Sequence, residues 1–333
     1  MVENVENIEN IEEKIEKSPT RWTWLTTTLK VLVSFGLVIF LLYQAGFSET
    51  IARLKTASPV SLIGALMVYF LGVFIRAYRW QGLLSKLGVK VSLGRLSWLY
   101  LIGFFFNQLV PTGIGGDAMR TYMLAKDGVG GSVAANSVIV DRAAGLYSLL
   151  VMGCLVLCFQ PSLVSSKIAL VLVGMTVGAT IGIIFLAWSS NRLNFEKLPF
   201  VGKKFSKAFS KFYASFADYS LTSLLKSLAV SIFFNLLLIV TNIFLAEALG
   251  LNISASYFFL FIPIISATLV LPFSINGTGT REWAYVFLFG QIGVEESAAL
   301  AMSLSFYGLN LFLALVGGAC FLVQSLQRSR EVL

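Results

Sequence analysis

Six long apolar runs alternate with polar stretches along the chain. A membrane-spanning helix needs about 20 mainly apolar residues, and each run reaches that length. The runs cover residues 25–47, 60–80, 133–159, 167–188, 227–250 and 297–324. The pattern therefore predicts an all-α polytopic membrane protein with six full spans.

Two further apolar regions are interrupted by proline and glycine. Residues 96–125 contain the sequence LVPTGIGGD, and residues 256–291 contain LPFSINGTG. Proline and clustered glycines end a helix, and inside a membrane the freed backbone groups must be covered by protein or by a wet cavity. We therefore expect both regions to be re-entrant hairpins, which enter the bilayer and return to the same side.

The two interruptions share one spacing. Both contain the pattern Pro-x4-Gly-x3-Arg, which begins at Pro111 and again at Pro272. The same offset brings spans 60–80 and 133–159 approximately onto the fifth and sixth spans. Each half then consists of two spans, a hairpin and a third span, so that the second half is upside down relative to the first. This order predicts a 3+3 inverted repeat, an architecture typical of secondary transporters.

These patterns divide the chain into three parts. The parts are an acidic cytoplasmic N-terminal segment 1–24, a single transmembrane domain 25–325 and a cytoplasmic tail 326–333. Within the domain, repeat 1 covers about residues 25–159 and repeat 2 about residues 167–324. A basic insertion, 189–226, carries a phenylalanine stripe beside lysines and predicts an amphipathic helix in the inner headgroup layer.

The composition narrows the chemistry. Hydrophobic residues make up 57% of the chain and charged residues only 13%, whereas a soluble domain carries about 25% charged residues. The sequence has no histidine, which excludes a Ser-His-Asp nucleophile and the usual zinc ligand sets. Its three cysteines lie in apolar runs, so no disulfide framework is expected. We predict no metal and no cofactor.

The formal net charge of +8 bears on orientation. Basic loop residues mark the cytoplasmic side of a membrane protein. With the N terminus inside, six crossings leave Arg53, Lys55 and Lys167 outside. The loop charges counted on the inner side at the end of the second span are Arg76, Arg79, Lys86, Lys90 and Arg95. We expect a multi-pass inner-membrane protein with both termini in the cytoplasm, and no nucleic-acid partner.

Charged residues in the interrupted regions and in the third span are the candidate functional groups. They are Asp117 and Arg120 in the first hairpin, Asp141 and Arg142 in the third span, and Arg281 and Glu282 in the second hairpin. Ionisable groups at bilayer depth are costly and by default mark function. One interpretation is purely structural, with acids and bases pairing to fix the hairpins against the third span.

The glycine-rich turns favour a binding interpretation. Backbone N–H groups that converge at the start of a helix, with an arginine one turn later, form an anion-binding arrangement. Arginine also holds phosphate through two parallel hydrogen bonds. The predicted binding residues are Arg120, Arg142, Arg281, Gly113, Gly115, Gly116, Asn276, Gly277 and Gly279. We expect Asp117, Asp141 and Glu282 to orient the arginines or to couple a proton.

Three segments resemble a known family. FFNQLVPTGIGGDAMRTYML, VDRAAGL at 140–146 and LPFSINGTGTRE at 271–282 resemble the signatures of the lysylphosphatidylglycerol synthase transmembrane family, which is also called flippase-like. The resemblance implies an integral inner-membrane protein related to the half of that synthase that moves aminoacylated phosphatidylglycerol across the bilayer. The six charged residues named above match its polar positions. Asn276 stands where the family often has glycine. We expect no aminoacyltransferase domain, so the resemblance does not imply synthase activity.

Three hypotheses for function follow. The first is a lipid translocase that binds the phosphate-bearing headgroup of an anionic or aminoacylated phospholipid, or of a polyprenyl-phosphate lipid, between the hairpins and moves it across the inner membrane. The second is a membrane-embedded transferase acting on a phospholipid or a polyprenyl-phosphate-linked sugar, in which paired carboxylates activate a hydroxyl. The third is a non-catalytic membrane partner that recruits a cytoplasmic enzyme through the insertion 189–226.

Overall fold

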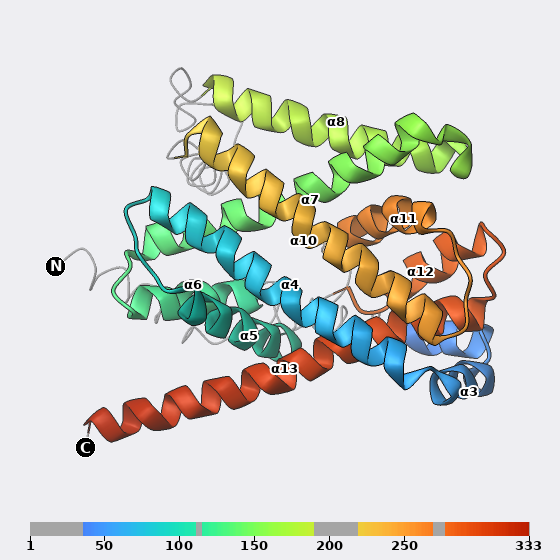
Figure 1. The fold of residues 1–333 in the computed structure, drawn as a ribbon, viewed down its shortest axis with the longest axis horizontal. Helices are drawn as coiled ribbons and strands as arrows, with labels where there is room; N and C mark the ends of the chain where they lie inside the picture. Colours follow the sequence, from blue (N-terminus) through green and yellow to red (C-terminus); the bar gives the residue numbers. More distant parts are fainter. Residues whose placement is uncertain (1–35, 111–114, 190–218, 269–276, 333) are drawn as a thin grey trace, which may run out of the picture.

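The computed structural model describes residues 36–110, 115–189, 219–268 and 277–332. All regular structure in these ranges is helical (Figure 1), which confirms the all-α class. The labelled elements are α3 (Phe47–Thr56), α4 (Pro59–Lys86), α5 (Leu93–Leu109), α6 (Gly115–Lys126), α7 (Gly131–Phe159), the short 3-10 helix η1 (Pro161–Leu163), α8 (Ser166–Ser189), α10 (Leu221–Ala248), α11 (Ala255–Thr268), α12 (Thr280–Gly290) and α13 (Glu296–Val332). A helix Gly36–Gln44 precedes α3.

Five helices in the described ranges are long and apolar enough to cross a membrane, namely α4, α7, α8, α10 and α13. The number becomes six if the helix Gly36–Gln44 and α3, which meet at a bend of 85°, form one span. The five helices correspond to the second to sixth predicted spans. Residues 25–35 of the first predicted span lie outside the described residues.

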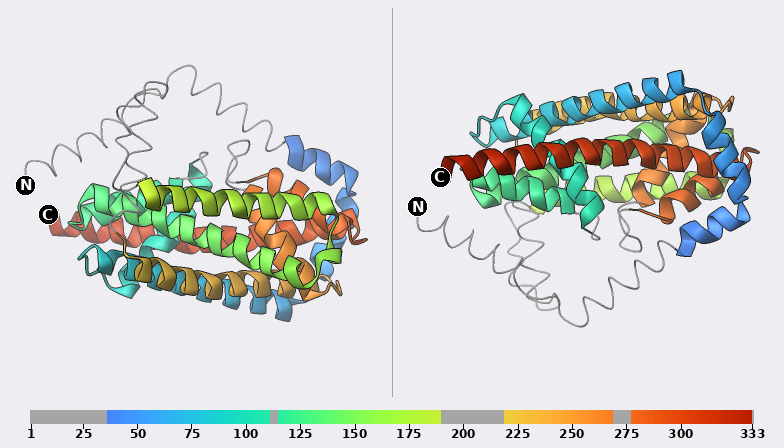
Figure 2. Two further views of the ribbon diagram at one scale, coloured as in Figure 1. Left: turned by 90° about the horizontal axis from the view of Figure 1, so that it is seen from above. Right: turned by 90° about the horizontal axis from the view of Figure 1, so that it is seen from below.

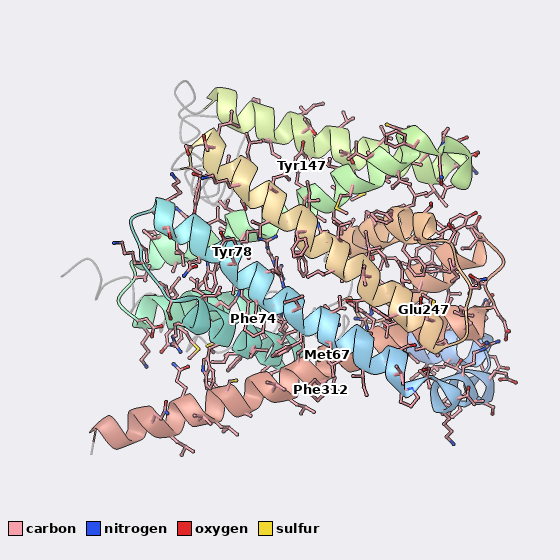
Figure 3. The ribbon with its side chains drawn as sticks, in the orientation of Figure 1. Met67, Phe74, Tyr78, Tyr147, Glu247 and Phe312 are labelled. Atoms are coloured by element: carbon pink, nitrogen blue, oxygen red, sulfur yellow. The ribbon has the colours of Figure 1, made fainter. Side chains whose placement is uncertain are left out.

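Large apolar side chains cover the outer surface of these helices. On α4, Met67, Phe74 and Tyr78 are 68%, 38% and 56% exposed, and Figure 3 shows them on the outer side of the helix. Contiguous exposed apolar surface on this scale is unfavourable in water. It is the surface expected of a helix that faces lipid.

Serine residues define where three of the helices begin. Ser58, Ser92 and Ser220 occupy the N-cap positions of α4, α5 and α10, and their hydroxyl oxygens accept from the backbone N–H three residues later. Such a cap satisfies a backbone donor that the first turn leaves free. Pro59 occupies the first position of α4, where a missing N–H has no cost.

Helices α4 and α10 run side by side in opposite directions along one face of the molecule (Figures 1 and 2). At their shared end, the Ser58 N–H donates to the carbonyl oxygen of Ala248 at 2.8 Å. A glycine on α4 allows close approach, because a Cβ atom at Gly72 would lie 3.1 Å from the Phe234 ring. Two long helices are thereby held together along their length.

Further contacts join helices of the two halves of the chain, and equivalent contacts occur within each half. Helix α5 packs against α13 and α11 against α7, while α6 contacts α7 and α12 contacts α13. In the first contact, a Cβ atom at Gly317 would lie 1.8 Å from the carbonyl oxygen of Leu101, so the two backbones touch. These pairings are the ones an internal repeat would produce, and the inverted 3+3 repeat stays a prediction.

Both interrupted regions consist of two separate helices. Helix α5 ends at Leu109 and α6 begins at Gly115, whereas α11 ends at Thr268 and α12 begins at Thr280. Residues 111–114 and 269–276, which include the predicted binding residues Gly113 and Asn276, lie outside the described residues. The helix breaks were predicted from proline and glycine, and the re-entrant path remains a prediction.

Helix α4 continues past the end predicted for the second span. The sequence placed Arg76 and Arg79 in an inner loop, but both belong to α4, which ends at Lys86. The loop placement is therefore wrong. Inside the protein, Arg79 pairs with Asp141, and Arg76 lies against the rings of Tyr100, Phe104 and Phe234. The predicted segment 1–24 lies outside the described residues, as does most of the insertion 189–226, and residues 326–332 continue α13.

Candidate functional site

A cavity of about 730 Å³ lies among α4, α5, α6, α7, α10, α11, α12 and α13. Both halves of the chain contribute to its wall. The charged residues that line it are Arg76, Arg79, Arg120, Arg142, Arg281, Asp117 and Asp141. Three of the predicted binding arginines therefore face one space, although Arg281 comes from the second interrupted region and the other two from the first half.

Asp141 is the centre of an ion-pair network. Its Oδ1 accepts from Arg79 Nε at 2.7 Å, and its Oδ2 lies 3.5 Å from Nη1 of Arg120. The same Oδ2 accepts from the Tyr100 hydroxyl. Asp141 is 1% exposed, and such a buried carboxylate requires several donors. The aspartate thus joins α4, α5, α6 and α7.

Asp117 extends the network from the first turn of α6. Its Oδ1 accepts from Arg120 Nη2 at 2.6 Å, and its Oδ2 pairs with Nε of Arg142. A carboxylate in the first turn also interacts favourably with the positive end of the helix dipole. The Arg142 side chain is 49% exposed, whereas that of Arg120 is 4% exposed. The ion pairs run continuously from Arg142 through Asp117, Arg120 and Asp141 to Arg79.

The second interrupted region holds a self-contained pair. Arg281 donates to Glu282 Oε1 from Nη2 at 2.6 Å and from Nε at 3.1 Å, and Ser303 on α13 bonds to both residues. The other oxygen of Glu282 accepts from the backbone N–H of Gly279. Glu282 does not line the cavity itself. It neutralises Arg281 from the side that faces away from the cavity. Arg281 also lies against the Tyr307 ring, 5.1 Å from its centroid.

The described glycines of the predicted site serve packing and backbone conformation. A Cβ atom at Gly116 would lie 2.2 Å from the carbonyl oxygen of Gly103, and one at Gly115 would lie 2.6 Å from the Val110 Cβ. Gly277 and Gly279 have φ of 75° and 84°, which glycine adopts without strain. The N–H groups of Gly116 and Gly279 donate to Asn107 and Glu282 within the protein.

Arg76 is the cavity arginine that no described carboxylate pairs with. Its guanidinium carbon lies 5.2, 5.0 and 4.8 Å from the ring centroids of Tyr100, Phe104 and Phe234. Its Nε and Nη2 atoms are buried and make no hydrogen bond with any described residue. The aromatic rings contact the face of the guanidinium group. Its Nε and Nη2 atoms can therefore still donate hydrogen bonds.

Two of the five cavity arginines were missed as site residues. Arg76 and Arg79 were predicted to be loop charges, yet their spacing of three residues within the apolar sequence VFIRAYRW places them on one face of a helix. That spacing was the available signal. Within the described ranges, no cluster of carboxylates or cysteines could hold a metal ion, and the absence of a metal stays a prediction.

Comparisons with known proteins identify the relatives of this chain. A family model described as the lysylphosphatidylglycerol synthase TM region matches residues 27–318. A UPF0104 membrane protein of Pyrococcus horikoshii is 26% identical over 196 residues, which are 56% of this chain and 58% of that protein. A UPF0104 membrane protein of Methanocaldococcus jannaschii is 27% identical over 118 residues, 35% of each chain. The matched stretches therefore cover less than two thirds of either relative.

Proposed function

Because this chain belongs to the lysylphosphatidylglycerol synthase TM region family, we propose that it is a lipid translocase. It binds the phosphate-bearing headgroup of an anionic or aminoacylated phospholipid, or of a polyprenyl-phosphate lipid, in the arginine-lined cavity. It moves that headgroup across the inner membrane while the acyl or prenyl chains stay in the bilayer.

The observation that carries this proposal is the position of five arginines around one cavity inside a bundle of apolar helices. The hydrocarbon core of a bilayer is about 30 Å thick, and a phosphate that enters it loses its hydration at a high cost. Arginine side chains replace that hydration with charge-assisted hydrogen bonds. The cavity arginines can therefore replace the hydration of a headgroup phosphate inside the hydrocarbon core.

The distribution of charge supports an orientation for this transport. Lys86, Lys90, Arg95 and Lys126 lie at the end of the bundle where α4 and α6 finish and α5 begins. One acidic residue, Asp127, also lies at this end, whereas the opposite end carries Glu49, Glu247, Glu295 and Glu296 beside Arg53 and Lys55. Because basic loops stay in the cytoplasm, we propose that the first end is cytoplasmic and that the protein lies in the inner membrane with both termini inside.

Transport can be measured directly with the purified full-length protein in liposomes. The liposomes contain a trace of lipid with a fluorescent headgroup, and an impermeant quencher is added outside. We expect quenching to pass from the outer-leaflet fraction, about half of the label, towards completeness when the protein moves the labelled lipid between leaflets. When a sugar-phosphate donor is also supplied, a product with a changed headgroup mass would indicate the transferase instead.

Two cavity variants and one control variant test the assigned site. Arg120→Ala and Arg281→Ala should abolish the additional quenching. Arg95→Ala removes an arginine paired with Asp127 outside the cavity and should leave the quenching unchanged. Melting temperatures of the purified variants identify any that fail to fold. Unchanged lipid movement in both cavity variants, with folding intact, contradicts the proposed site.

A further inference from the structure

Nε and Nη2 of Arg76 make no hydrogen bond with a described residue. Other arginines of this protein use the same two atoms to bind carboxylates. Nε and one terminal nitrogen of a guanidinium present two parallel N–H groups, which match two oxygens of one carboxylate or phosphate. Arg95 uses Nε and Nη2 to hold Asp127 at 2.7 and 3.0 Å, and Arg281 uses the same pair of atoms for Glu282. In Arg76 these two atoms are buried and lack a hydrogen-bond partner among the described residues.

The rest of the Arg76 side chain is fixed in place. Phe74 and Tyr78 lie two positions to either side along α4 and face outwards (Figure 3). A step of two residues turns about 200° around a helix, so Arg76 points into the bundle, where it lines the cavity. The rings of Tyr100, Phe104 and Phe234 hold its face. A positioned cation with an unused pair of donors is thus available to a ligand.

The cavity also has more positive than negative charge. The ion-pair network contains three arginines and two aspartates, and the pair of Arg281 with Glu282 is neutral. Arg76 adds one further positive charge, so the excess among the described residues is two. In the sequence, segments 111–114 and 269–276, which adjoin α6 and α11, contain no charged residue. A ligand with two negative charges would neutralise the site, and an uncompensated charge at this depth is costly.

We propose that the cavity binds a lipid phosphate monoester, which carries two negative charges, and that Arg76 is the residue that receives its phosphate. This inference rests on the lipid-binding role proposed above and narrows the ligand to one class. Arg120 provides a second contact, because its buried Nη1 lies 3.5 Å from Asp141 Oδ2 in an ion pair but makes no hydrogen bond to a described residue. Both guanidinium groups lie against the Tyr100 ring, at 5.2 and 4.0 Å from its centroid.

The net charge of the cavity predicts how strongly other lipids bind. Phosphatidylglycerol is a diester with a single negative charge and leaves one positive charge in the cavity unmatched. Lysyl-phosphatidylglycerol has a net positive headgroup and adds to the excess. The phosphate monoester can belong to a glycerolipid, as in phosphatidate, or to a polyprenyl monophosphate, and both present the same group to Arg76.

Competition for the purified full-length protein in detergent tests this ranking. A fluorescent phosphatidate is displaced with unlabelled phosphatidate, polyprenyl monophosphate, phosphatidylglycerol, lysyl-phosphatidylglycerol or inorganic phosphate. At about pH 8 we expect at least one monoester lipid to compete at about tenfold lower concentration than phosphatidylglycerol, a difference of about one unmatched charge. The two monoesters identify the lipid class, and inorganic phosphate should compete poorly because it lacks the chains.

The pH profile provides a readout that a structural role for Arg76 would not produce. The second ionisation of a phosphate monoester has a pKa of about 6, so binding should strengthen from about pH 5 to about pH 8. A diester does not titrate in this interval. Besides the arginines, two carboxylates, Asp117 and Asp141, and three tyrosines, Tyr69, Tyr100 and Tyr285, line the cavity. The chain has no histidine, the side chain that ordinarily titrates there.

Arg76 variants test the residue itself. Arg76→Gln should weaken phosphatidate binding by about tenfold or more and flatten its pH profile. Arg76→Lys keeps the charge but loses the paired donors, and should be intermediate. Lys86→Gln, at the exposed end of the same helix, is the control and should change nothing. Arg76→Gln leaves no described carboxylate without its partner, so this variant should fold, and its melting temperature checks this.

The results separate this inference from the translocase. If phosphatidylglycerol or lysyl-phosphatidylglycerol competes as well as both monoesters, or if folded Arg76→Gln binds phosphatidate normally, the inference is overturned while transport of another lipid can stand. If the wild-type protein moves no lipid in liposomes yet binds monoesters through Arg76, the translocase fails and the ligand assignment holds. Should Arg76→Gln fail to fold, the wild-type ranking and pH profile still decide the ligand class.

Discussion

Arg79 on α4 and Asp141 on α7 form an ion pair of 2.7 Å whose two side chains are only 4% and 2% exposed. Two further donors, Arg120 and Tyr100, surround the same carboxylate, and Arg79 also donates to Ser231 on α10 at 2.8 Å. A pair that is buried to this extent gains little net stability from its attraction, but the loss of one partner leaves a charge without water or counter-ion. The two residues therefore fix the position of α4 relative to α7.

Removal of one member of this pair should strongly destabilise the protein. For Arg79→Leu alone or Asp141→Leu alone we expect a loss of about 3–5 kcal/mol, seen as a large fall in the melting temperature of the purified protein. The double variant should recover much of this loss, because Arg120 keeps Asp117 as its partner. The same cycle at the more exposed pair Arg95–Asp127 should cost less than about 1 kcal/mol per change. Equal effects at both pairs would contradict this account.

A second prediction concerns the contact between α5 and α6. In Gly116→Ala the new methyl group would meet the carbonyl oxygen of Gly103 at 2.2 Å, and a backbone atom cannot rotate away. Helices α5 and α6 must move apart, and overpacking of this kind costs about 1–3 kcal/mol or more. Gly94→Ala on α5 is the control, because a Cβ atom there meets no atom within 4 Å. That change should stabilise the helix by about 0.5–1 kcal/mol, so the two substitutions should move the melting temperature in opposite directions.

The fold was largely predictable because the bilayer imposes long apolar runs. Helices α4, α7, α8, α10 and α13 lie where those runs predicted spans, and both interruptions fall at proline and glycine, as helix chemistry requires. The right-angled bend before α3 was not predicted. Its sequence, Gln44 to Phe47, contains one glycine with positive φ, Gly46, and a single glycine is too weak a signal to distinguish a bend from a loop.

The charged site was predicted in part. Asp117, Arg120, Asp141 and Arg142 were expected to meet, and a continuous network joins them. The sequence could not show that the Gly116 N–H is already used by Asn107, since that bond depends on the angle between α5 and α6. For the same reason it could not show that Nε and Nη2 of Arg76 make no hydrogen bond with a described residue, because pairing is decided by which helices face each other. The roles of these residues in binding stay predictions.

A third prediction concerns the turn before α12. Gly279 has φ of 84°, and Glu282 accepts from its N–H while also pairing with Arg281. Gly279→Ala would force an L side chain into the left-handed region, at a cost of about 1–2 kcal/mol, and would disturb the position of Arg281. We expect a lower melting temperature together with reduced lipid movement. Gly290→Ala, at the other end of α12, meets no atom within 4 Å and serves as the control.

The fourth prediction concerns the orientation of the bundle. Lys90 lies between α4 and α5, and Glu49 lies on α3, at the opposite end of the molecule. Both are exposed. Because basic loops stay on the cytoplasmic side, an impermeant maleimide added to intact cells should label the Glu49→Cys variant and spare the Lys90→Cys variant.

This labelling requires a background in which Cys154, Cys158 and Cys320 are replaced by alanine, since Cys158 is exposed. After the cells are opened, both variants should be labelled equally, which shows that the two positions are reactive. Labelling of Lys90→Cys in intact cells, with Glu49→Cys protected, would mean that the bundle is inserted the other way.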